Sequence, residues 1–265
     1  MPINAIIAAI TRERQACAYP NGITIYQSQK EYDRLVELGA EDIKFPGEVI
    51  LDVQGIESAK VEYVVNRLKM MHEKGKRSVV FSMFIGAFEE IERRLNEAGI
   101  RVATIIGETD RAERNRIKKD FRRKPDGSQP ENYKYDVVLC NYKPGGVGLT
   151  LTGATYMCKL DEEWSPGKNE QAHRRIYRIG QTEETLVETL RIVKARIEDG
   201  REDESQPQTI DQWMKMLNET KQLTVDGFES EVNLVDMYKA FRGIKTKPSK
   251  SERLAAILED DDLFA

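Results

Sequence analysis

Two arginines and a glutamine in the stretch QAHRRIYRIGQ, residues 171–181, have a spacing suited to binding an anion. If this stretch is helical, Gln171, Arg175 and Arg178 lie at positions i, i+4 and i+7, which places all three side chains on one face. The planar guanidinium group of arginine donates paired hydrogen bonds to phosphate oxygens. Taken alone, the pattern is more often a solvated basic face or a ladder of internal ion pairs.

The glycine-rich segment KPGGVGLTL, residues 143–151, is a second candidate for phosphate binding. Three glycines within four residues, Gly145, Gly146 and Gly148, allow backbone N–H groups to approach an anion closely. Lys143 adds a positive charge. An ordinary tight turn is the alternative explanation for such a segment.

An acidic pair, Asp161 and Glu162, follows an apolar run and looks like the Mg²⁺-binding pair of a P-loop NTPase. That pair functions only with a G-x-x-x-x-G-K-[ST] phosphate loop. The two candidates, GKRS at 75–78 and GKNE at 167–170, are both incomplete. We therefore interpret the pair as a turn or helix-start feature.

His72 and His173 lack partners at metal-ligand spacing, so we predict no metal site and interpret both as surface groups.

The composition of the chain limits the classes of function. A net charge of -4 and a pI near 5.6 exclude a uniformly basic nucleic-acid coat, so any nucleic-acid contact must be local. Three widely separated cysteines indicate reduced thiols rather than disulfides or metal ligands. No run is long and apolar enough to cross a membrane, and the N-terminus does not resemble a signal peptide. We predict a soluble, intracellular protein.

Strand and helix patterns alternate along the middle of the chain, which predicts an α/β fold with a parallel sheet covered by helices on both faces. Loops at the carboxyl ends of parallel strands meet at one rim, so KPGGVGLTL, DEEWSPGKNEQ and GETD are expected to converge. The expected helices are 58–76, 85–99 and 110–123, and the expected strands are 78–84, 101–106, 136–140, 154–160 and 184–193.

The flanking regions are less regular. Residues 1–20 predict a helix, and 21–57 contain strand-like pieces that we do not place. A polar linker follows residue 198, and then two short helices and an acidic tail complete a helical extension. Leu263 and Phe264 in this tail could anchor a protein partner, although a frayed terminus is the commoner explanation.

Residues 58–195 resemble the second RecA-like lobe, or helicase C-terminal domain, of the Swi/Snf family of superfamily 2 helicase-like ATPases. The segment 171–181 is similar to Q-x-x-x-R-x-H-R-I-G-Q, 145–152 to G-G-x-G-L-x-L-T and 164–166 to W-x-P. Residues 5–20 resemble the segment that joins the first lobe to the second. Tyr177 replaces a usual histidine, and 141–144 replace a Ser-Thr-Arg-Ala-like run, which alters the expected DNA contacts.

The resemblance implies a role for each candidate residue. ATP would lie between two lobes, with the phosphate loop and the Mg²⁺-binding acidic pair on a first lobe. Arg175 and Arg178 would act as arginine fingers, and Gln171 and Gly148 would be further ATP contacts. The implied contacts to DNA backbone phosphates are Ser82, Met83, Gly107, Thr109, Lys143, Gly145 and Gly146. Capping and turn chemistry explain Ser82 and Thr109 equally well, and Trp164 is more simply a structural wedge under the arginine helix.

We therefore predict three regions: a connector with an irregular segment (1–57), a RecA-like lobe (58–198) and a linker, helices and tail (199–265). The predicted function is the C-terminal motor lobe of a DNA-dependent ATPase that translocates on duplex DNA. Alternatives are a non-catalytic DNA- or partner-binding module and an RNA-directed helicase lobe. We expect the first lobe to come from the same longer protein or from a separate polypeptide, and this chain alone to be inactive.

Overall fold

The computed structural model describes residues 3–22, 56–142, 149–194, 197–198, 201–202, 208–225, 238 and 241–243. The chain divides into two compact units with the boundary between residues 228 and 229. Within the described ranges, no helix has the length and apolar character needed to cross a membrane.

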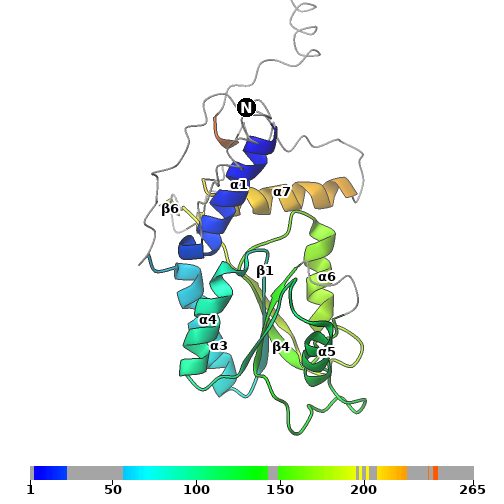
Figure 1. Ribbon diagram of the computed structural model, residues 1–265. Helices are drawn as coiled ribbons and strands as arrows, with labels where there is room; N and C mark the ends of the chain where they lie inside the picture. The colour runs from blue at the N-terminus through cyan, green and yellow to red at the C-terminus, as the bar shows by residue number, and fades with distance from the viewer. Residues whose placement is uncertain are drawn as a thin grey trace, which may run out of the picture. The chain divides into compact units, whose positions relative to one another are not determined.

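A parallel sheet of five strands forms the centre of the first unit (Figure 1). The strands lie in the order β2-β3-β1-β4-β5, so β1 occupies the middle and β2 an edge. Their bounds are Arg77–Ser82 for β1, Val102–Ile105 for β2, Val137–Asn141 for β3, Ala154–Lys159 for β4 and Leu186–Thr189 for β5. The predicted α/β fold is confirmed.

Two helices cover each face of the sheet (Figure 1). On one face, α3 (Ala59–Glu73) and α4 (Phe88–Glu97) pack an apolar core against alternate residues of the strands. On the other face, α5 (Arg111–Asp120) and α6 (Pro166–Ile176) form a second core. This second face carries the candidate site, because α6 contains most of the stretch 171–181.

Local sequence signals explain several helix ends. Asp110 caps α5, and its carboxylate accepts from the backbone N–H groups of Ala112 and Glu113. Gly99 follows α4 with a φ of 76°, a left-handed conformation that glycine adopts without steric cost. The helix predicted over 85–99 instead begins with a 3₁₀ turn, η2 (Ile85–Ala87). Ile85 is consequently 44% exposed rather than packed in the core.

Helices α1 (Ile3–Ala18) and α7 (Ile210–Val225) lie beyond the carboxyl ends of the strands (Figure 1). A 3₁₀ turn, η1 (Pro20–Gly22), follows α1. In the expected linker, β6 (Ile197–Glu198) and β7 (Arg201–Glu202) form a two-stranded antiparallel ribbon. The strand-like pieces within 23–55, most of the last predicted helix and the acidic tail lie outside the described residues.

Candidate functional site

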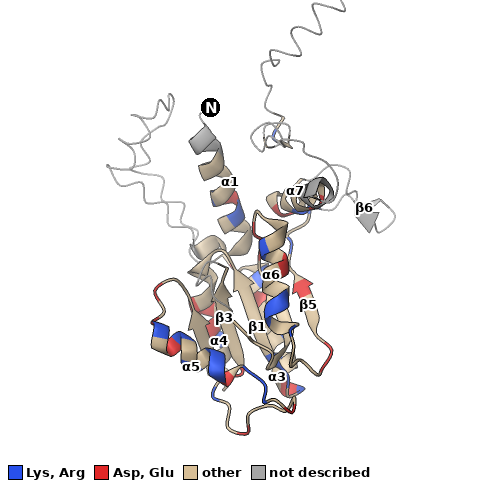
Figure 2. Ribbon diagram, turned by 90° about the vertical axis from the view of Figure 1, so that its right-hand side faces the viewer, with Lys and Arg blue, Asp and Glu red and all other residues tan. Residues whose placement is uncertain are grey.

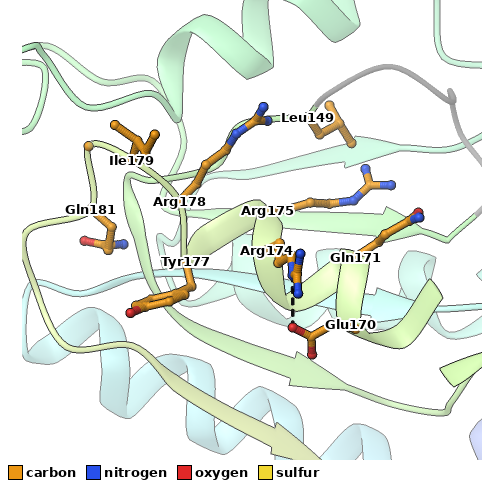
Figure 3. Close-up of a pocket in the computed structure, with 10 residues that line it drawn as sticks. Leu149, Glu170, Gln171, Arg174, Arg175, Tyr177, Arg178, Ile179 and Gln181 are labelled. Atoms are coloured by element: carbon orange, nitrogen blue, oxygen red, sulfur yellow. Dashed lines mark hydrogen bonds and ion pairs between the residues drawn. The ribbon is translucent and has the colours of Figure 1, made fainter. Parts of the chain in front are cut away.

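A pocket of about 860 Å³ opens at the carboxyl-terminal end of α6 (Figure 3). Arginine and glutamine side chains dominate its polar lining, and the apolar lining comes from the neighbouring loops. The lining residues are Leu149, Glu170, Gln171, Arg174, Arg175, Tyr177, Arg178, Ile179, Gly180 and Gln181. All three anion-binding candidates of the stretch 171–181 therefore lie around one pocket.

Helix α6 begins with proline at its first position and ends at Ile176, with Tyr177 as its C-cap. Ala172 and Ile176 are buried in the core and fix the orientation of the helix. Arg178 lies beyond the helix, so the prediction that one helix face carries both arginines was wrong. The turn after the helix nevertheless returns Arg178 to the pocket that Arg175 lines.

Arg175 is half-buried, and its guanidinium carbon lies 5.7 Å from the centre of the Phe81 ring. Burial lowers the pKa of this guanidinium below its ordinary value. The Nη1 atom is buried and has no hydrogen-bond acceptor in the described part of the chain. An unpaired buried donor is costly, so this atom is a strong candidate for binding an external acceptor.

The neighbouring arginines differ in their partners. Arg174 forms an ion pair with Glu170 at 3.1 Å, and this pair points in a different direction from the Arg175 side chain (Figure 3). Arg178 is exposed and donates from Nη1 to the Thr150 hydroxyl at 3.1 Å. Among the described residues, no carboxylate pairs with Arg175 or Arg178. The pocket therefore carries uncompensated positive charge suited to an anion.

Gln181 forms the base of this turn, a role that the sequence analysis missed. Its Nε2 atom donates to the carbonyl oxygens of Thr152, Ala154 and Ile176 at 3.0, 2.8 and 3.3 Å. Its Oε1 atom accepts from the next two backbone N–H groups, both at 3.1 Å. The last residue of the stretch therefore holds the turn against the start of β4.

Asp161 is buried, and its carboxylate is hydrogen-bonded to other groups of the protein. Its carboxylate accepts hydrogen bonds from the Ser82 hydroxyl and from the backbone N–H of Met83, the latter at 2.9 Å. Ser82 is fully buried, and both donors are therefore used at the end of β1. The DNA contacts predicted for Ser82 and Met83 stay untested, and they would require these hydrogen bonds to break.

The turn after β2 contains the other described DNA candidates. Gly107 is exposed, and Thr109 is half-exposed. The Thr109 hydroxyl accepts from the backbone N–H of Ile106 at 2.8 Å and lies 3.3 Å from the Thr104 carbonyl. The hydroxyl therefore closes the turn, and only the exposed backbone of this turn is available to a ligand.

Most of the predicted phosphate-binding loop, residues 143–151, falls outside the described residues. Lys143, Gly145, Gly146 and Gly148 lie outside the described residues. Their predicted contacts with DNA and ATP stay predictions. At the end of this segment, Leu149 lines the arginine pocket and the Thr150 hydroxyl accepts a hydrogen bond from Arg178.

Arg14 of α1 is a second feature that the sequence analysis missed. Its side chain is buried, donates to the carbonyl oxygen of Glu162 and stacks on Trp164, which also packs edge-on against Trp213 of α7 at 6.4 Å. Trp164 is thus a structural wedge, as predicted, but between α1 and α7. Arg14 belongs to the family-like segment 5–20, which was the available signal for this contact.

The described residues contain no group of three or more histidine, cysteine, aspartate or glutamate side chains that could hold a metal ion. None of the three cysteines is in a disulfide, and burial raises the pKa of the Cys140 and Cys158 thiols to about 12. These two thiols are therefore protonated core groups. His173 is half-buried rather than a simple surface group, and burial lowers its pKa.

Residues 59–180 match the family described as the helicase conserved C-terminal domain. The SWI2/SNF2 ATPase core of Sulfolobus solfataricus, solved in complex with dsDNA, has a similar fold, with a TM-score of 0.50 and 20% identity. That similarity covers 92% of this chain and 48% of the archaeal one. This segment is similar to the second RecA-like lobe of Swi/Snf-family helicases.

Eukaryotic relatives agree with this assignment of the helicase lobe. The DNA repair protein RAD5A of Arabidopsis thaliana is 30% identical over 155 residues, which are 58% of this chain and 14% of that protein. The DNA excision repair protein ERCC-6-like of Danio rerio is 33% identical over 132 residues, which are 49% of this chain and 8% of that protein. The chain thus spans only a small part of the length of these relatives.

Proposed function

We propose that this lobe belongs to a DNA-dependent ATPase that translocates on double-stranded DNA, and that Arg175 and Arg178 act as its arginine fingers. The observation that carries the proposal is the buried Nη1 atom of Arg175, which has no acceptor among the described residues and lies in a pocket shared with Arg178. A phosphate oxygen would supply the missing acceptor, and the phosphates of a nucleotide would supply several.

The residues of the chain fit this role chemically. In phosphoryl transfer, negative charge is spread over the oxygens of the transferred group, and guanidinium donors stabilise that charge. Arg175 and Arg178 would donate to these oxygens, while the exposed Gln171 would bind a phosphate or its water. ATP supplies the phosphoryl group when bound. The buried position of Asp161 supports assigning Mg²⁺ and the phosphate loop to a first lobe.

Duplex DNA is the proposed track. The exposed backbone at Gly107 and Thr109 and the loop with Lys143, Gly145 and Gly146 would contact phosphates without reading base sequence. The archaeal SWI2/SNF2 core with the similar fold was solved in complex with dsDNA, which supports a duplex as the partner. Sequence-independent contacts suit a motor that must release and grip successive nucleotides.

The test uses a two-lobe enzyme assembled from this chain and a polypeptide that carries a first RecA-like lobe. We expect Arg175→Ala and Arg178→Ala each to lower kcat for ATP by about 10³-fold or more, with little change in ATP affinity. Arg174→Ala is the matched control, because Arg174 is adjacent, exposed and paired with Glu170. It should retain turnover close to that of the unchanged protein.

The outcome separates this function from two others. Equal turnover for Arg175→Ala and Arg174→Ala would contradict the proposal and indicate a non-catalytic binding module. Stronger stimulation of turnover by RNA than by duplex DNA would indicate an RNA-directed helicase lobe. We also expect this chain without a first lobe to show negligible ATP hydrolysis, since it contains no complete phosphate loop.

A further inference from the structure

Helix α5 and the four residues that follow it carry a concentration of positive charge that the arginine pocket does not explain. Eight of the fourteen residues 111–124 are lysine or arginine and two are acidic, in a chain whose net charge is -4. Figure 2 shows lysine and arginine residues along this helix. The charge is therefore local, which is the distribution expected of a contact surface for a polyanion.

Three of these cations form a stripe, which we define as Arg111, Lys118 and Arg122. Arg111 and Lys118 are two helical turns apart and share one face of α5. Arg122 comes one turn later, just after the C-cap Phe121, and its backbone N–H still bonds to the preceding turn at 3.3 Å. The Arg111 and Arg122 side chains are exposed, and Lys118 is half-exposed.

The acidic residues of the same helix do not neutralise the stripe. Glu113 pairs with Arg116 at 3.0 Å, on another side of the helix. Asp120 forms an ion pair with the buried Arg77 at 2.5 Å. No ion pair joins a cation of the stripe to a carboxylate among the residues the structure describes. Lys118 and Arg122 are four residues apart at the end of the helix, so these two like charges repel each other and an external anion would offset that repulsion.

Arg114 links the stripe to the turn at the end of β2. It lies between Arg111 and Lys118 in the sequence, and its Nη2 atom donates to the carbonyl oxygen of Thr109 at 3.1 Å. The exposed backbone at Gly107 and Thr109 therefore stands at the beginning of the cationic helix. Backbone N–H groups and mobile cationic side chains together are the usual means of holding a phosphate strand.

We propose that the stripe on α5 is a contact surface for the phosphate backbone of duplex DNA, continuing from the turn at Gly107. The proposal rests on the proposed function in taking duplex DNA as the partner. The stripe has no base-reading geometry of its own, so its contribution is electrostatic and independent of DNA sequence. It therefore adds to the salt dependence of binding.

The experiment measures binding of the 265-residue chain to a fluorescein-labelled 25-base-pair duplex of arbitrary sequence across a series of salt concentrations. The double variant Arg111→Gln/Lys118→Gln should lower the magnitude of the slope of log K against log salt by about one per residue. Adding Arg122→Gln should lower it by about one more. Thermal unfolding of the double variant should show a Tm close to that of the unchanged protein, because neither side chain forms an ion pair among the described residues.

The matched control is Lys69→Gln/Lys74→Gln, at a residue of α3 and at its C-cap, and it changes the net charge equally. Helix α3 covers the opposite face of the sheet. It should leave the slope unchanged. An unchanged slope for the α5 variant, an equal change for both variants, or no binding by the unchanged chain at low salt would each overturn the proposal. Tighter binding to an RNA duplex through the same residues would assign the stripe to RNA instead.

This test can fail separately from the proposed function. The arginine-finger role is measured as ATP turnover of a two-lobe enzyme, whereas the stripe is measured as salt-dependent DNA binding by this chain alone. Loss of turnover in Arg175→Ala with an unchanged DNA-binding slope in Arg111→Gln/Lys118→Gln would uphold the first proposal and reject the second.

Discussion

The guanidinium carbon of Arg14 lies 4.6 Å from the centre of the Trp164 ring, so α1 directly contacts the loop that precedes the arginine helix. Arg14 is 3% exposed and donates to the carbonyl oxygen of Glu162 and to the sulfur of Met83. The negative charge of nearby Asp161 stabilises the guanidinium, although burial lowers its pKa. The connector-like helix is thereby fixed to the strand ends that support the site.

Replacing Arg14 with methionine removes the hydrogen bonds and the ring contact that hold α1 against the strand ends. We expect Arg14→Met to lower the free energy of unfolding by about 2–4 kcal/mol, through loss of charge-assisted hydrogen bonds and cation–π contacts. Urea unfolding measures the change. Arg12→Met, an exposed position on the same helix, should change it by less than about 0.5 kcal/mol. Equal stability of the two variants would contradict the structural role of Arg14.

Asp161 predicts a specific dependence of stability on pH. Burial raises the pKa of its carboxyl group above the ordinary value of 3.8, so folding favours the protonated form. Its contribution to stability is complete below pH 3.8 and is lost as pH rises through the raised pKa. Asp161→Asn cannot ionise, so it should gain stability relative to the unchanged protein as pH rises from below 3.8 to neutral.

Both effects are measured by thermal unfolding at a series of pH values, in which Asp110 provides a control of opposite sign to Asp161. Backbone N–H groups at the start of α5 lower the pKa of its carboxyl group, so its contribution is present above the unfolded pKa and lost on acidification. Asp110→Asn should therefore lose stability relative to the unchanged protein as pH rises. If the stability of both variants, relative to the unchanged protein, changed with pH in the same direction, burial would not determine the pKa of Asp161.

Arg175 is expected to cost stability in the absence of a ligand, because its Nη1 atom is buried without an acceptor in the described structure. Arg175→Met keeps an apolar stem against Phe81 and removes the charge. We expect the free energy of unfolding of this chain to stay unchanged or to rise by about 1 kcal/mol. A loss of more than about 2 kcal/mol in chemical unfolding would show that Arg175 mainly stabilises the fold.

Gln181, unlike Arg175, is expected to stabilise the fold. Gln181→Glu places a carboxylate against three carbonyl oxygens that now accept from the amide. We expect a loss of about 1–3 kcal/mol in the free energy of unfolding, measured with denaturant at neutral pH. Gln171→Glu makes the same chemical change at an exposed position of the same pocket and should alter stability by less than about 0.5 kcal/mol.

The sheet and its covering helices could be predicted because they depend on local patterns. Apolar runs mark the buried strands, and a helical spacing of apolar residues marks α3 and α4. The cap at Asp110 also follows from a short sequence pattern. These signals use only neighbouring residues, and the compact core confirms them.

Contacts between distant residues could not be predicted in this way. Arg14 and Glu162 are 148 positions apart, and no local pattern links them. An acidic residue after a strand has the same sequence signature whether it binds metal or is buried as Asp161 is. The end of α6 was missed for another reason. Gly180 was an available stop signal, but the even spacing of Gln171, Arg175 and Arg178 favoured a longer helix.

Because α6 ends at Ile176, Arg175 belongs to the helix and Arg178 belongs to the turn that follows it. Arg175 moves with a helix whose buried side chains are fixed in the core. Arg178 moves with a short turn that runs to Gly180, where φ is 100°. A substitution in that turn can therefore change the reach of one arginine without displacing the other, so the two groups can be adjusted independently by mutation.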